Sequence, residues 1–343
     1  MSKNFLITGG AGFIGSNYVN RLLSRGEDVV IFDNLSRAGA EKNLEWLYAS
    51  YGINAFELVQ EDIRNEKKIQ AAAENADVII HLAGQVAVTT SVTNPREDFE
   101  INALGTFNVL EAARNSGRDP IVLYASTNKV YGGMEDVVVE EGETRYYYRD
   151  FPNGISEDRS LDFHSPYGCS KGCGDQYVRD YSRIYNLPGI VFRQSCIYGP
   201  RQFGIEDQGW VAWFIIATVL KQPMSIFGDG KQVRDLLHVE DLMNAYDAAI
   251  KNIDKTAGEV FNIGGGSKHV MSVWKEFGPI LETLSENTIP VQWGDWRPGD
   301  QRIYVSDIQK AKDVMKWEPK LSVEEGISKL FHWVVENKHL FQD

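Results

Sequence analysis

The sequence predicts an α/β protein: a doubly wound parallel sheet with a smaller C-terminal substrate-binding lobe. Three observations lead to this fold class. Short apolar, β-branched segments alternate with helical patterns over residues 1–192, and a glycine-rich turn joins the first strand to the first helix. The alternation becomes irregular after about residue 193, where aromatic residues, glycine and proline increase. Near-continuous apolar strands separated by helices are typical of a parallel sheet that is covered on both faces.

The first part of the chain repeats a unit of one strand and one helix. Such units join parallel strands through right-handed crossovers. The strands are expected at residues 5–8, 28–33, 56–60, 77–83, 121–125 and 189–192, and the helices at 13–25, 99–115 and 177–185.

Two later segments return to this first domain, namely a helix at 239–250 and a strand at 260–263. Helices at 274–284 and 323–336 are expected in the second lobe. Residues 133–165 form a long connection, rich in charged and aromatic residues, of the kind that is usually functional or mobile. The first domain therefore comprises 1–192 and 233–263, and the second comprises 193–232 and 264–343.

Charge and cysteine content exclude several classes of protein. The chain has 35 Lys and Arg against 48 Asp and Glu, a formal net charge of −13, whereas a nucleic-acid-binding face needs clustered positive charge. The longest uncharged apolar run, 211–220, is shorter than the ~20 residues that span a bilayer. Cys169, Cys173 and Cys196 form no disulfide or zinc pattern. We therefore expect a cytoplasmic protein without a metal site. The negative net charge does not exclude binding of a phosphate-bearing small molecule, because a few suitably placed arginines are enough for that.

The glycine-rich turn follows the first strand and opens the first helix. Gly9, Gly12 and Gly15 have the spacing GxxGxxG. The first glycine permits the tight turn, the second lets a pyrophosphate approach the backbone, and the third allows the helix to pack closely on the sheet. The helix N-terminus attracts the anion. Asp33 ends the second strand, where an acidic residue accepts hydrogen bonds from the adenosine ribose.

Asp33 also bears on the choice of cofactor. Its charge would repel the 2′-phosphate of NADP, so its position favours NAD, although nearby Arg37 points the other way. Asp62 and Ile63 end the third strand and are placed to contact the adenine. An ordinary helix N-cap is the alternative explanation for Asp62.

Tyr167 and Lys171 are four residues apart, which places them on one face of a helix. A tyrosine has an ordinary pKa of about 10 and is a weak base at neutral pH, but a nearby ammonium favours its phenolate. Tyr167 can then accept a hydroxyl proton while hydride leaves the same carbon. Ser126 and Thr127 end the fifth strand, where their hydroxyls either bond the reacting oxygen or serve only the turn at the strand end.

Motifs along nearly the whole chain carry a resemblance. They are TGGAGFIG (8–15), HLAGQ (81–85), NALGT (102–106), STNKVYG (126–132), PYGCSK (166–171), FRQSCIYGPRQ (192–202), VRDLLHVEDL (233–242), FNIGG (261–265) and RPGDQR (297–302). In this order they resemble the extended short-chain dehydrogenase/reductase superfamily of nucleotide-sugar enzymes. The resemblance implies a Rossmann domain that binds NAD, a C-terminal nucleotide-sugar lobe, and catalysis by Thr127, Tyr167 and Lys171.

The resemblance also implies the other site residues. Those expected at the cofactor are Gly9, Gly12, Phe13, Ile14, Asp33, Asn34, Asp62, Ile63, Leu82, Ala83, Gln85, Asn102, Ser126, Tyr167 and Lys171. Those expected at the substrate are Gln85, Asn128, His164, Gln194, Ser195, Arg201, Gln208, Arg234 and Arg297. Of these, Arg234 and Arg297 are expected at the substrate pyrophosphate, since a guanidinium makes bidentate phosphate contacts. For Asn102, the hydrogen bonding of a buried polar group explains the residue equally well.

The residues after Thr127 limit which reaction of the superfamily the chain is expected to catalyse. Sugar 4,6-dehydratases of the superfamily carry an Asp-Glu pair there, whereas this chain has Asn128 and Lys129. Dehydration is disfavoured without the carboxylate base, but an epimerase that removes a hydride and returns it to the other face of the sugar needs neither residue. The segments STNKVYG (126–132), LDFHSPYGCSKG (161–172), DQGWVAWF (207–214) and GKQVRDLLHVEDL (230–242) are similar to the CDP-paratose 2-epimerase family.

That similarity implies transient oxidation at C2 of a CDP-sugar, converting CDP-paratose to CDP-tyvelose for lipopolysaccharide O-antigen. One alternative is a CDP- or UDP-hexose 2- or 4-epimerase. Another is a non-catalytic dinucleotide sensor, which the presence of Tyr167 and Lys171 disfavours. The expected partners are the nucleotide sugar and further copies of the chain, as a homodimer or homotetramer formed through helices near 99–115 and 171–185, with neither nucleic acid nor membrane.

Overall fold

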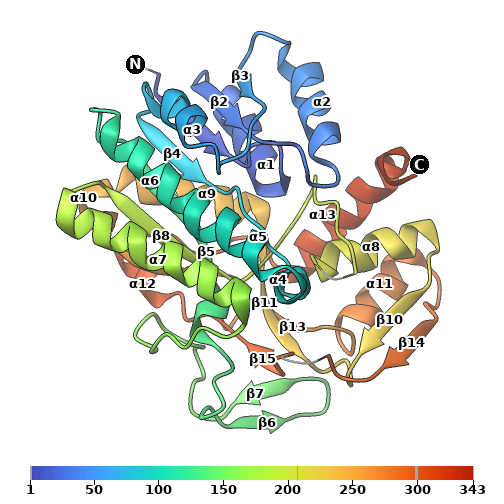
Figure 1. Ribbon diagram of the computed structural model, residues 1–343. Helices are drawn as coiled ribbons and strands as arrows, with labels where there is room; N and C mark the ends of the chain where they lie inside the picture. The colour runs from blue at the N-terminus through green and yellow to red at the C-terminus, as the bar shows by residue number, and fades with distance from the viewer. Residues whose placement is uncertain (1, 207, 298–299, 343) are drawn as a thin grey trace.

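The computed structural model describes residues 2–206, 208–297 and 300–342, and a large parallel sheet lies at its centre (Figure 1). Its seven strands have the order β12-β8-β5-β4-β1-β2-β3. The order reverses between β4 and β1, and in such sheets ligands bind in the crevice at the carboxyl ends of the strands where this reversal occurs. The strands are β1 (Asn4–Thr8), β2 (Asp28–Phe32), β3 (Glu57–Val59), β4 (Val78–His81), β5 (Ile121–Thr127), β8 (Gly189–Gln194) and β12 (Val260–Ile263).

Helices cover both faces of this sheet, and the strand sequences explain why. Successive side chains of a strand point to opposite faces, so Ile79 and Ile80 of β4 enter different apolar clusters. The helices that contribute to one cluster are α1 (Phe13–Leu23), α2 (Ala40–Tyr51), α9 (Val239–Lys251) and α12 (Gln309–Met315). The helices that contribute to the other are α3 (Glu66–Ala73), α6 (Gly105–Asn115) and α7 (Ser165–Tyr185).

A second lobe is built around a separate apolar cluster that includes Phe214, Phe277 and Leu330. Strand β11 pairs there with β9, β13 and β15, and β10 pairs with β14. The helices of this lobe are α8 (Trp210–Leu220), α11 (Phe277–Ser285) and α13 (Val323–Glu336). Its strands are β9 (Cys196–Tyr198), β10 (Met224–Phe227), β11 (Val233–His238), β13 (Val270–Ser272), β14 (Val291–Gly294) and β15 (Ile303–Tyr304).

The long connection 133–165 contains a hairpin of β6 (Val139–Glu141) and β7 (Tyr146–Tyr148). The hairpin lies at the bottom of Figure 1, beside the second lobe. Arg145 forms an ion pair of 2.6 Å with Glu276, and Lys231 forms one of 2.7 Å with Glu141. These bonds tie the connection to the second lobe. The short helical segments elsewhere are α4 (Val88–Thr93), α5 (Pro95–Phe99), η1 (Glu100–Leu104), η2 (Asn128–Tyr131), α10 (Ile253–Thr256) and η3 (Lys338–Phe341).

All six strands expected within the first 192 residues lie in the large sheet, and the later helix and strand expected near 239–250 and 260–263 are α9 and β12. The helix expected over 99–115 is divided, because the π-helical turn η1 precedes α6. Residues 233–238 were expected in the first domain with the rest of 233–263, but they form β11, which lies outside the large sheet. Among the described residues, no helix is both long enough and apolar enough to cross a membrane.

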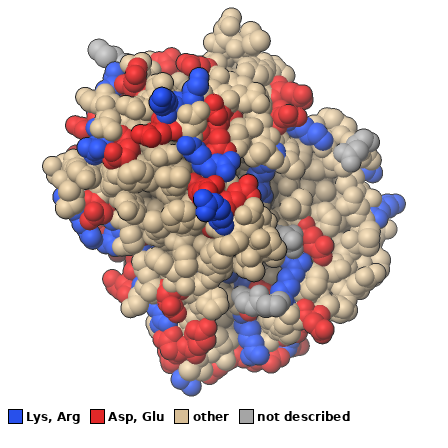
Figure 2. Space-filling view, in the orientation of Figure 1, with Lys and Arg blue, Asp and Glu red and all other residues tan. Residues whose placement is uncertain are grey.

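Charged side chains are mixed by sign on the face seen in Figure 2. Lys and Arg alternate there with Asp and Glu, and no continuous basic surface covers the drawn residues of that face. A nucleic-acid-binding face would show clustered positive charge instead.

Candidate active site

The glycine turn between β1 and α1 lies at the crevice between β1 and β4. Gly9 has φ of 72°, a value that L side chains rarely adopt, and a Cβ added there would lie 2.7 Å from the Ala83 nitrogen at the end of β4. A Cβ at Gly15 would overlap the carbonyl oxygen of Gly9. Glycine is therefore required at both positions, which leaves backbone amides and the α1 N-terminus open to an anion.

Asp33, directly after β2, closes this turn. Its carboxylate accepts hydrogen bonds from the backbone nitrogens of Ala11, at 3.0 Å, and Leu35, at 2.8 Å. Burial raises the pKa of Asp33, and these backbone bonds oppose the rise. Asn34 donates to Asp62 at 3.1 Å, so the expected cofactor residues at the ends of β2 and β3 lie together.

Asn102 of the π-helical turn fixes the segment after β4. Its side-chain oxygen accepts from the Gln85 nitrogen at 2.9 Å, and its amide nitrogen donates to the Gln85 oxygen at 3.0 Å and to Asp98 at 3.1 Å. Asn102 is buried, so these bonds satisfy a buried polar group and at the same time position the backbone of Gln85. π-helical turns are frequent at functional sites.

Tyr167 and Lys171 are both buried on α7, which the sheet places beside the end of β5. Burial raises the pKa of Tyr167 to about 12, and the nearby Thr127 hydroxyl and Arg37 guanidinium act against this rise. Burial lowers the pKa of Lys171 to about 7, against the opposing influence of Asp98. The Lys171 ammonium lies 4.3 Å from the ring centre of Tyr124 on β5. The structure thus brings the Tyr, Thr and Lys together around the carboxyl end of β5.

A buried ion pair under these residues is absent from the sequence-based expectations. Asp175 of α7 pairs with Arg193 of β8 at 2.9 Å, and the two side chains are 0% and 3% exposed. Ser126 donates to Asp175 at 2.8 Å, and Arg193 donates to the Tyr131 hydroxyl at 3.1 Å. Asp175 stands four residues after Lys171, so its place on the same helix face was the available signal.

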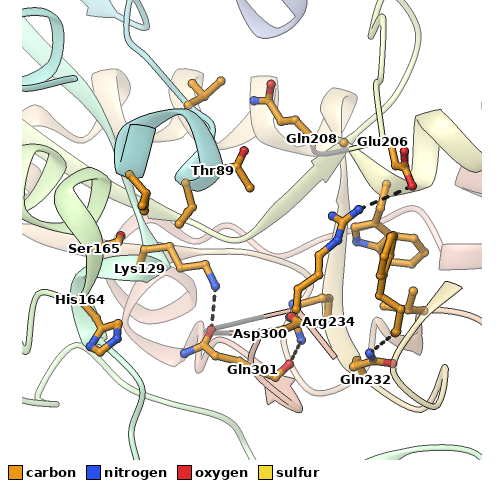
Figure 3. Close-up of a pocket in the computed structure, with 18 of the residues that line it drawn as sticks. Thr89, Lys129, His164, Ser165, Glu206, Gln208, Gln232, Arg234, Asp300 and Gln301 are labelled. Atoms are coloured by element: carbon orange, nitrogen blue, oxygen red, sulfur yellow. Dashed lines mark hydrogen bonds and ion pairs between the residues drawn. The ribbon is translucent and has the colours of Figure 1, made fainter. Parts of the chain in front are cut away.

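The large cavity, of about 560 Å³, lies between this end of the sheet and the second lobe (Figure 3). Its walls come from the turn after β5, the start of α7, the segment before α8, and the loops around β10 and β11. It is lined by Val86, Val88, Thr89, Val92, Lys129, Gly132, Gly133, His164, Ser165, Glu206, Gln208, Gly209, Trp210, Phe214, Ser225, Phe227, Gln232, Arg234, Val273, Arg297, Asp300 and Gln301.

Two arginines of the cavity already have carboxylate partners. Arg234 pairs with Asp300 at 2.9 Å, and the two side chains are 13% and 27% exposed. Arg297 lies 3.7 Å from Glu206, and its guanidinium lies 3.9 Å from the ring centre of Phe227. Pro298 and Gly299, which belong to the RPGDQR motif, lie outside the described residues.

The structure separates the other expected substrate residues. His164 and Gln208 line the large cavity with the two arginines. Arg201 lines a smaller cavity of about 70 Å³ beside Gly12 and Arg37. Gln194 donates to the Tyr246 hydroxyl at 2.8 Å, and Ser195 donates to Asp235, so both are engaged by buried partners.

Asn128 and Gln85 are also held by close neighbours. Asn128 accepts a hydrogen bond from Thr127 at 3.3 Å, and Gln85 donates to the Ala87 oxygen at 2.7 Å. No group of three or more His, Cys, Asp or Glu side chains suited to a metal ion occurs within 2–206, 208–297 and 300–342.

This fold and site define a class: dinucleotide-dependent enzymes with a Rossmann sheet and a Tyr-Lys pair. The chain belongs to the GDP-mannose 4,6-dehydratase family, whose profile matches residues 6–330, an extended short-chain dehydrogenase/reductase family of nucleotide-sugar epimerases and dehydratases.

Two curated relatives match almost the whole chain. It is 46% identical over 340 residues to the CDP-paratose 2-epimerase of Salmonella typhi, with 96% of this chain and 98% of that protein covered. It is 34% identical over 336 residues to a putative UDP-glucose 4-epimerase of Methanocaldococcus jannaschii, with 97% and 98% covered.

A solved relative connects the fold to its cofactor. The UDP-glucuronic acid 4-epimerase of Bacillus cereus, in complex with UDP-glucuronic acid and NAD, superposes with a TM-score of 0.82 and 27% identity, covering 97% of this chain and 99% of that one. The family is NAD-dependent. The glycine turn fits this cofactor, because the close approaches at Gly9 and Gly15 leave no room for side chains where a pyrophosphate meets the backbone.

Proposed function

We propose that the chain is an NAD-dependent epimerase that converts CDP-paratose to CDP-tyvelose by transient oxidation at C2. One observation carries the proposal: Thr127, Tyr167 and Lys171 lie together at the end of β5, while the turn that follows presents Asn128 and Lys129 in place of a carboxylate pair. The high identity to the S. typhi CDP-paratose 2-epimerase supports the choice of sugar and base.

The proton at the reacting oxygen is assigned to Tyr167. The Thr127 hydroxyl lies close enough to lower the pKa of Tyr167, so the two groups together are proposed to orient a substrate hydroxyl. Tyr167 accepts the hydroxyl proton during oxidation and returns it during reduction. NAD, when bound, supplies the hydride acceptor and the hydride donor for the carbon that is inverted. Lys171 stabilises the phenolate by its charge and binds the nicotinamide ribose.

Chemistry at C2 explains why a hydride route is needed. The C2–H bond of the sugar is not acidic without a neighbouring carbonyl, so a simple proton abstraction does not invert this centre. The carboxylates that line the cavity, Glu206 and Asp300, both lie beside arginines in the second lobe. This arrangement offers no carboxylate base in the turn after Thr127 and favours epimerisation over 4,6-dehydration.

The residues proposed to hold NAD surround the β1–β4 crevice. Gly9, Gly12, Phe13 and Ile14 form the turn and the helix start, and Asp33 and Asn34 follow β2. Those proposed at the adenine and nicotinamide ends are Asp62, Ile63, Leu82, Ala83, Gln85, Asn102 and Ser126. The Asp33 carboxylate supports NAD rather than NADP, because it would repel a 2′-phosphate.

The substrate is proposed to lie along the large cavity. The diphosphate binds Arg234 and Arg297. Its oxygens replace the carboxylate oxygens that now pair with the two guanidinium groups, because phosphate and carboxylate present similar hydrogen-bond geometry to a guanidinium. The sugar then extends toward Tyr167, with His164 and Gln208 on the cavity wall. Asn128, Gln194, Ser195, Arg201 and Gln85 complete the proposed substrate shell.

The interleaved domains 1–192 with 233–263 and 193–232 with 264–343 are proposed as the cofactor and substrate units. We also propose that the protein is a cytoplasmic homo-oligomer of O-antigen synthesis. Figure 1 shows α6 and α7 side by side on one flank. The apolar side chains exposed on and beside these helices are Phe99, Leu104, Phe107, Tyr177, Ile184 and Tyr185. A second copy that pairs through this face would bury them.

The test compares three substrates by NMR: CDP-paratose, CDP-glucose and UDP-glucose. The proposal predicts inversion at C2 of CDP-paratose with the highest kcat/KM. Preferred turnover of UDP-glucose at C4 would establish the alternative, a UDP-hexose 4-epimerase. Binding of NAD without turnover of any of the three would support the dinucleotide sensor and contradict the proposal.

A further inference from the structure

Lys129 extends from the catalytic end of the sheet into the large cavity. It belongs to the short helical turn η2 directly after β5, and its backbone nitrogen donates to the Thr127 hydroxyl at 3.2 Å. The Thr127 hydroxyl in turn lies close enough to Tyr167 to lower the pKa of its phenol. Figure 3 shows the Lys129 side chain crossing the cavity wall toward Gln301 of the other lobe. The ammonium therefore stands beside the space where the reacting sugar is proposed to lie.

Gln301 holds this ammonium in one position. The Lys129 Nζ donates to the Gln301 Oε1 at 2.9 Å, and the Gln301 Nε2 donates to the Gly132 oxygen at 2.6 Å. The second bond fixes the orientation of the amide, because only its nitrogen can donate to a carbonyl. Its oxygen consequently faces Lys129.

In the part of the chain that the structure describes, the positive charge of Lys129 lacks the close carboxylate partner that each of the two cavity arginines has. Arg234 and Arg297 each have a carboxylate within 4.0 Å, whereas none lies that close to Lys129 among the described residues. An ammonium has three donors, and the hydrogen bond to Gln301 uses one. Burial lowers the pKa of Lys129 to about 8; the Arg234 guanidinium adds to the lowering, and the more distant Asp300 carboxylate opposes it.

A half-buried cation such as Lys129, without a carboxylate partner within 4.0 Å among the residues described, carries a cost in stability. If the contact of Lys129 with Gln301, which bonds the Gly132 carbonyl, were purely structural, the side chain at position 129 would not need a charge. Because Lys129 lines the large cavity, the two remaining donors of its ammonium instead fit an oxygen atom of the ligand.

We propose that the Lys129 ammonium binds an oxygen of the hexose, at a hydroxyl other than the one that is oxidised, and so determines how the sugar lies against Tyr167. This inference rests on the proposed function. The sugar is favoured over the diphosphate because Lys129 rises from the turn that carries Thr127. The arginines proposed for the diphosphate come from β11 and from the segment after β14.

The test measures dissociation constants by calorimetry for two matched ligand pairs, CDP with CDP-paratose and UDP with UDP-glucose. The variants are Lys129→Met and Gln301→Ala, and the control is Lys329→Met, whose exposed ammonium pairs with Glu240 on the surface. Thermal melting checks that each variant is folded. If Lys129→Met does not fold, Lys129→Gln replaces it and keeps polar donors in place.

Lys129→Met is expected to weaken CDP-paratose binding about 10- to 100-fold while CDP binding changes less than twofold. Gln301→Ala is expected to show a smaller loss in the same direction, and Lys329→Met no loss. Equal weakening of CDP and CDP-paratose, or no change in either, would overturn the inference.

The second ligand pair separates this inference from the proposed function. If the wild-type protein binds UDP and UDP-glucose rather than the CDP ligands, the proposed base is wrong. In that case, weaker binding of UDP-glucose but not of UDP by Lys129→Met still supports Lys129 as a sugar contact. Unchanged binding of UDP-glucose by this variant overturns that contact. A wild-type protein that binds neither pair would contradict both.

Discussion

The carboxyl end of the large sheet (the sheet end) and the second-lobe wall of the large cavity (the lobe end) hold their charges in different ways. At the sheet end, the Asp175–Arg193 pair that underlies the proposed catalytic residues is 0% and 3% exposed, and Ser126 and Tyr131 share its hydrogen bonds. At the lobe end, the Arg297 and Glu206 side chains are 33% and 47% exposed and 3.7 Å apart. One end is a fixed buried network, and the other has ion pairs that are partly exposed to solvent.

This difference indicates a division of tasks. A buried, fully bonded network keeps the hydroxyl and ammonium groups of a site in one arrangement. A half-exposed ion pair contributes little to stability, so its arginine can exchange a carboxylate for a phosphate at small cost. The sheet end is therefore expected to determine the rate of the chemistry, and the lobe end to determine the affinity for the nucleotide.

The largest effect is expected from Tyr167→Phe at the sheet end. Loss of the proton acceptor should lower kcat by about 10²- to 10⁴-fold while NAD stays bound. Steady-state kinetics and the NAD released on denaturation check both points. The control Tyr177→Phe removes an exposed hydroxyl from the same helix and should leave kcat unchanged. Full activity of Tyr167→Phe would contradict the assignment of the acid/base.

Asp175→Asn tests whether the buried network supports the sheet end. The change leaves Arg193 charged and buried without its partner, and breaking such a pair typically costs about 3–5 kcal/mol of unfolding free energy. Urea denaturation measures the loss. Glu240→Gln, at the solvated pair with Lys329, should change stability far less. Similar small losses for the two variants would mean that the buried pair is dispensable.

Arg234→Gln tests the lobe end. Removal of a charged phosphate contact should raise KM about 10- to 100-fold, and kcat should change less than threefold because Arg234 does not touch the reacting carbon. The matched control is Arg118→Gln, at an exposed pair with Asp77, and neither of these two residues lines the cavity. A fall in kcat with unchanged KM would reverse the division between the two ends.

The smallest effect concerns the pH dependence of stability through Lys171. Its pKa in the folded protein is about 7, below the ordinary value of about 10.4. The cost of burying its charge is complete below pH 7 and declines as pH rises toward 10.4. Between pH 7 and 10.4, the unfolding free energy of the wild type should therefore rise relative to that of Lys171→Met by at most about 1.4 kcal/mol per pH unit. Urea denaturation at pH 6, 7.5 and 9 measures the gap, and a gap that is independent of pH would contradict the shift.

Local patterns in the sequence predicted the sheet end well. The GxxGxxG turn, Asp33 and the Tyr167–Lys171 spacing each depend on neighbours within one strand-helix unit, and the structure places them around one crevice. The Asp175–Arg193 pair was missed because its members lie on α7 and β8, and neither has a distinctive local sequence.

Long-range contacts limited the prediction of the lobe end. Lys129 and Gln301 meet only after the chain has folded, since 172 residues separate them. The resemblance implied substrate contacts for Gln194, the last residue of β8, and for Ser195, and in the structure their side chains bond the distant Tyr246 and Asp235. Spacing along a chain does not determine which face of a strand end a side chain takes when the partners are distant.

The most direct test of the central claim uses CDP-paratose labelled with deuterium at C2. The protein is incubated with this substrate in ordinary water, and the sugar is followed by NMR. The account predicts CDP-tyvelose inverted at C2 with the deuterium retained, because the hydride removed from one face is returned to the other. Loss of the deuterium to solvent, or inversion at C4 alone, would contradict it.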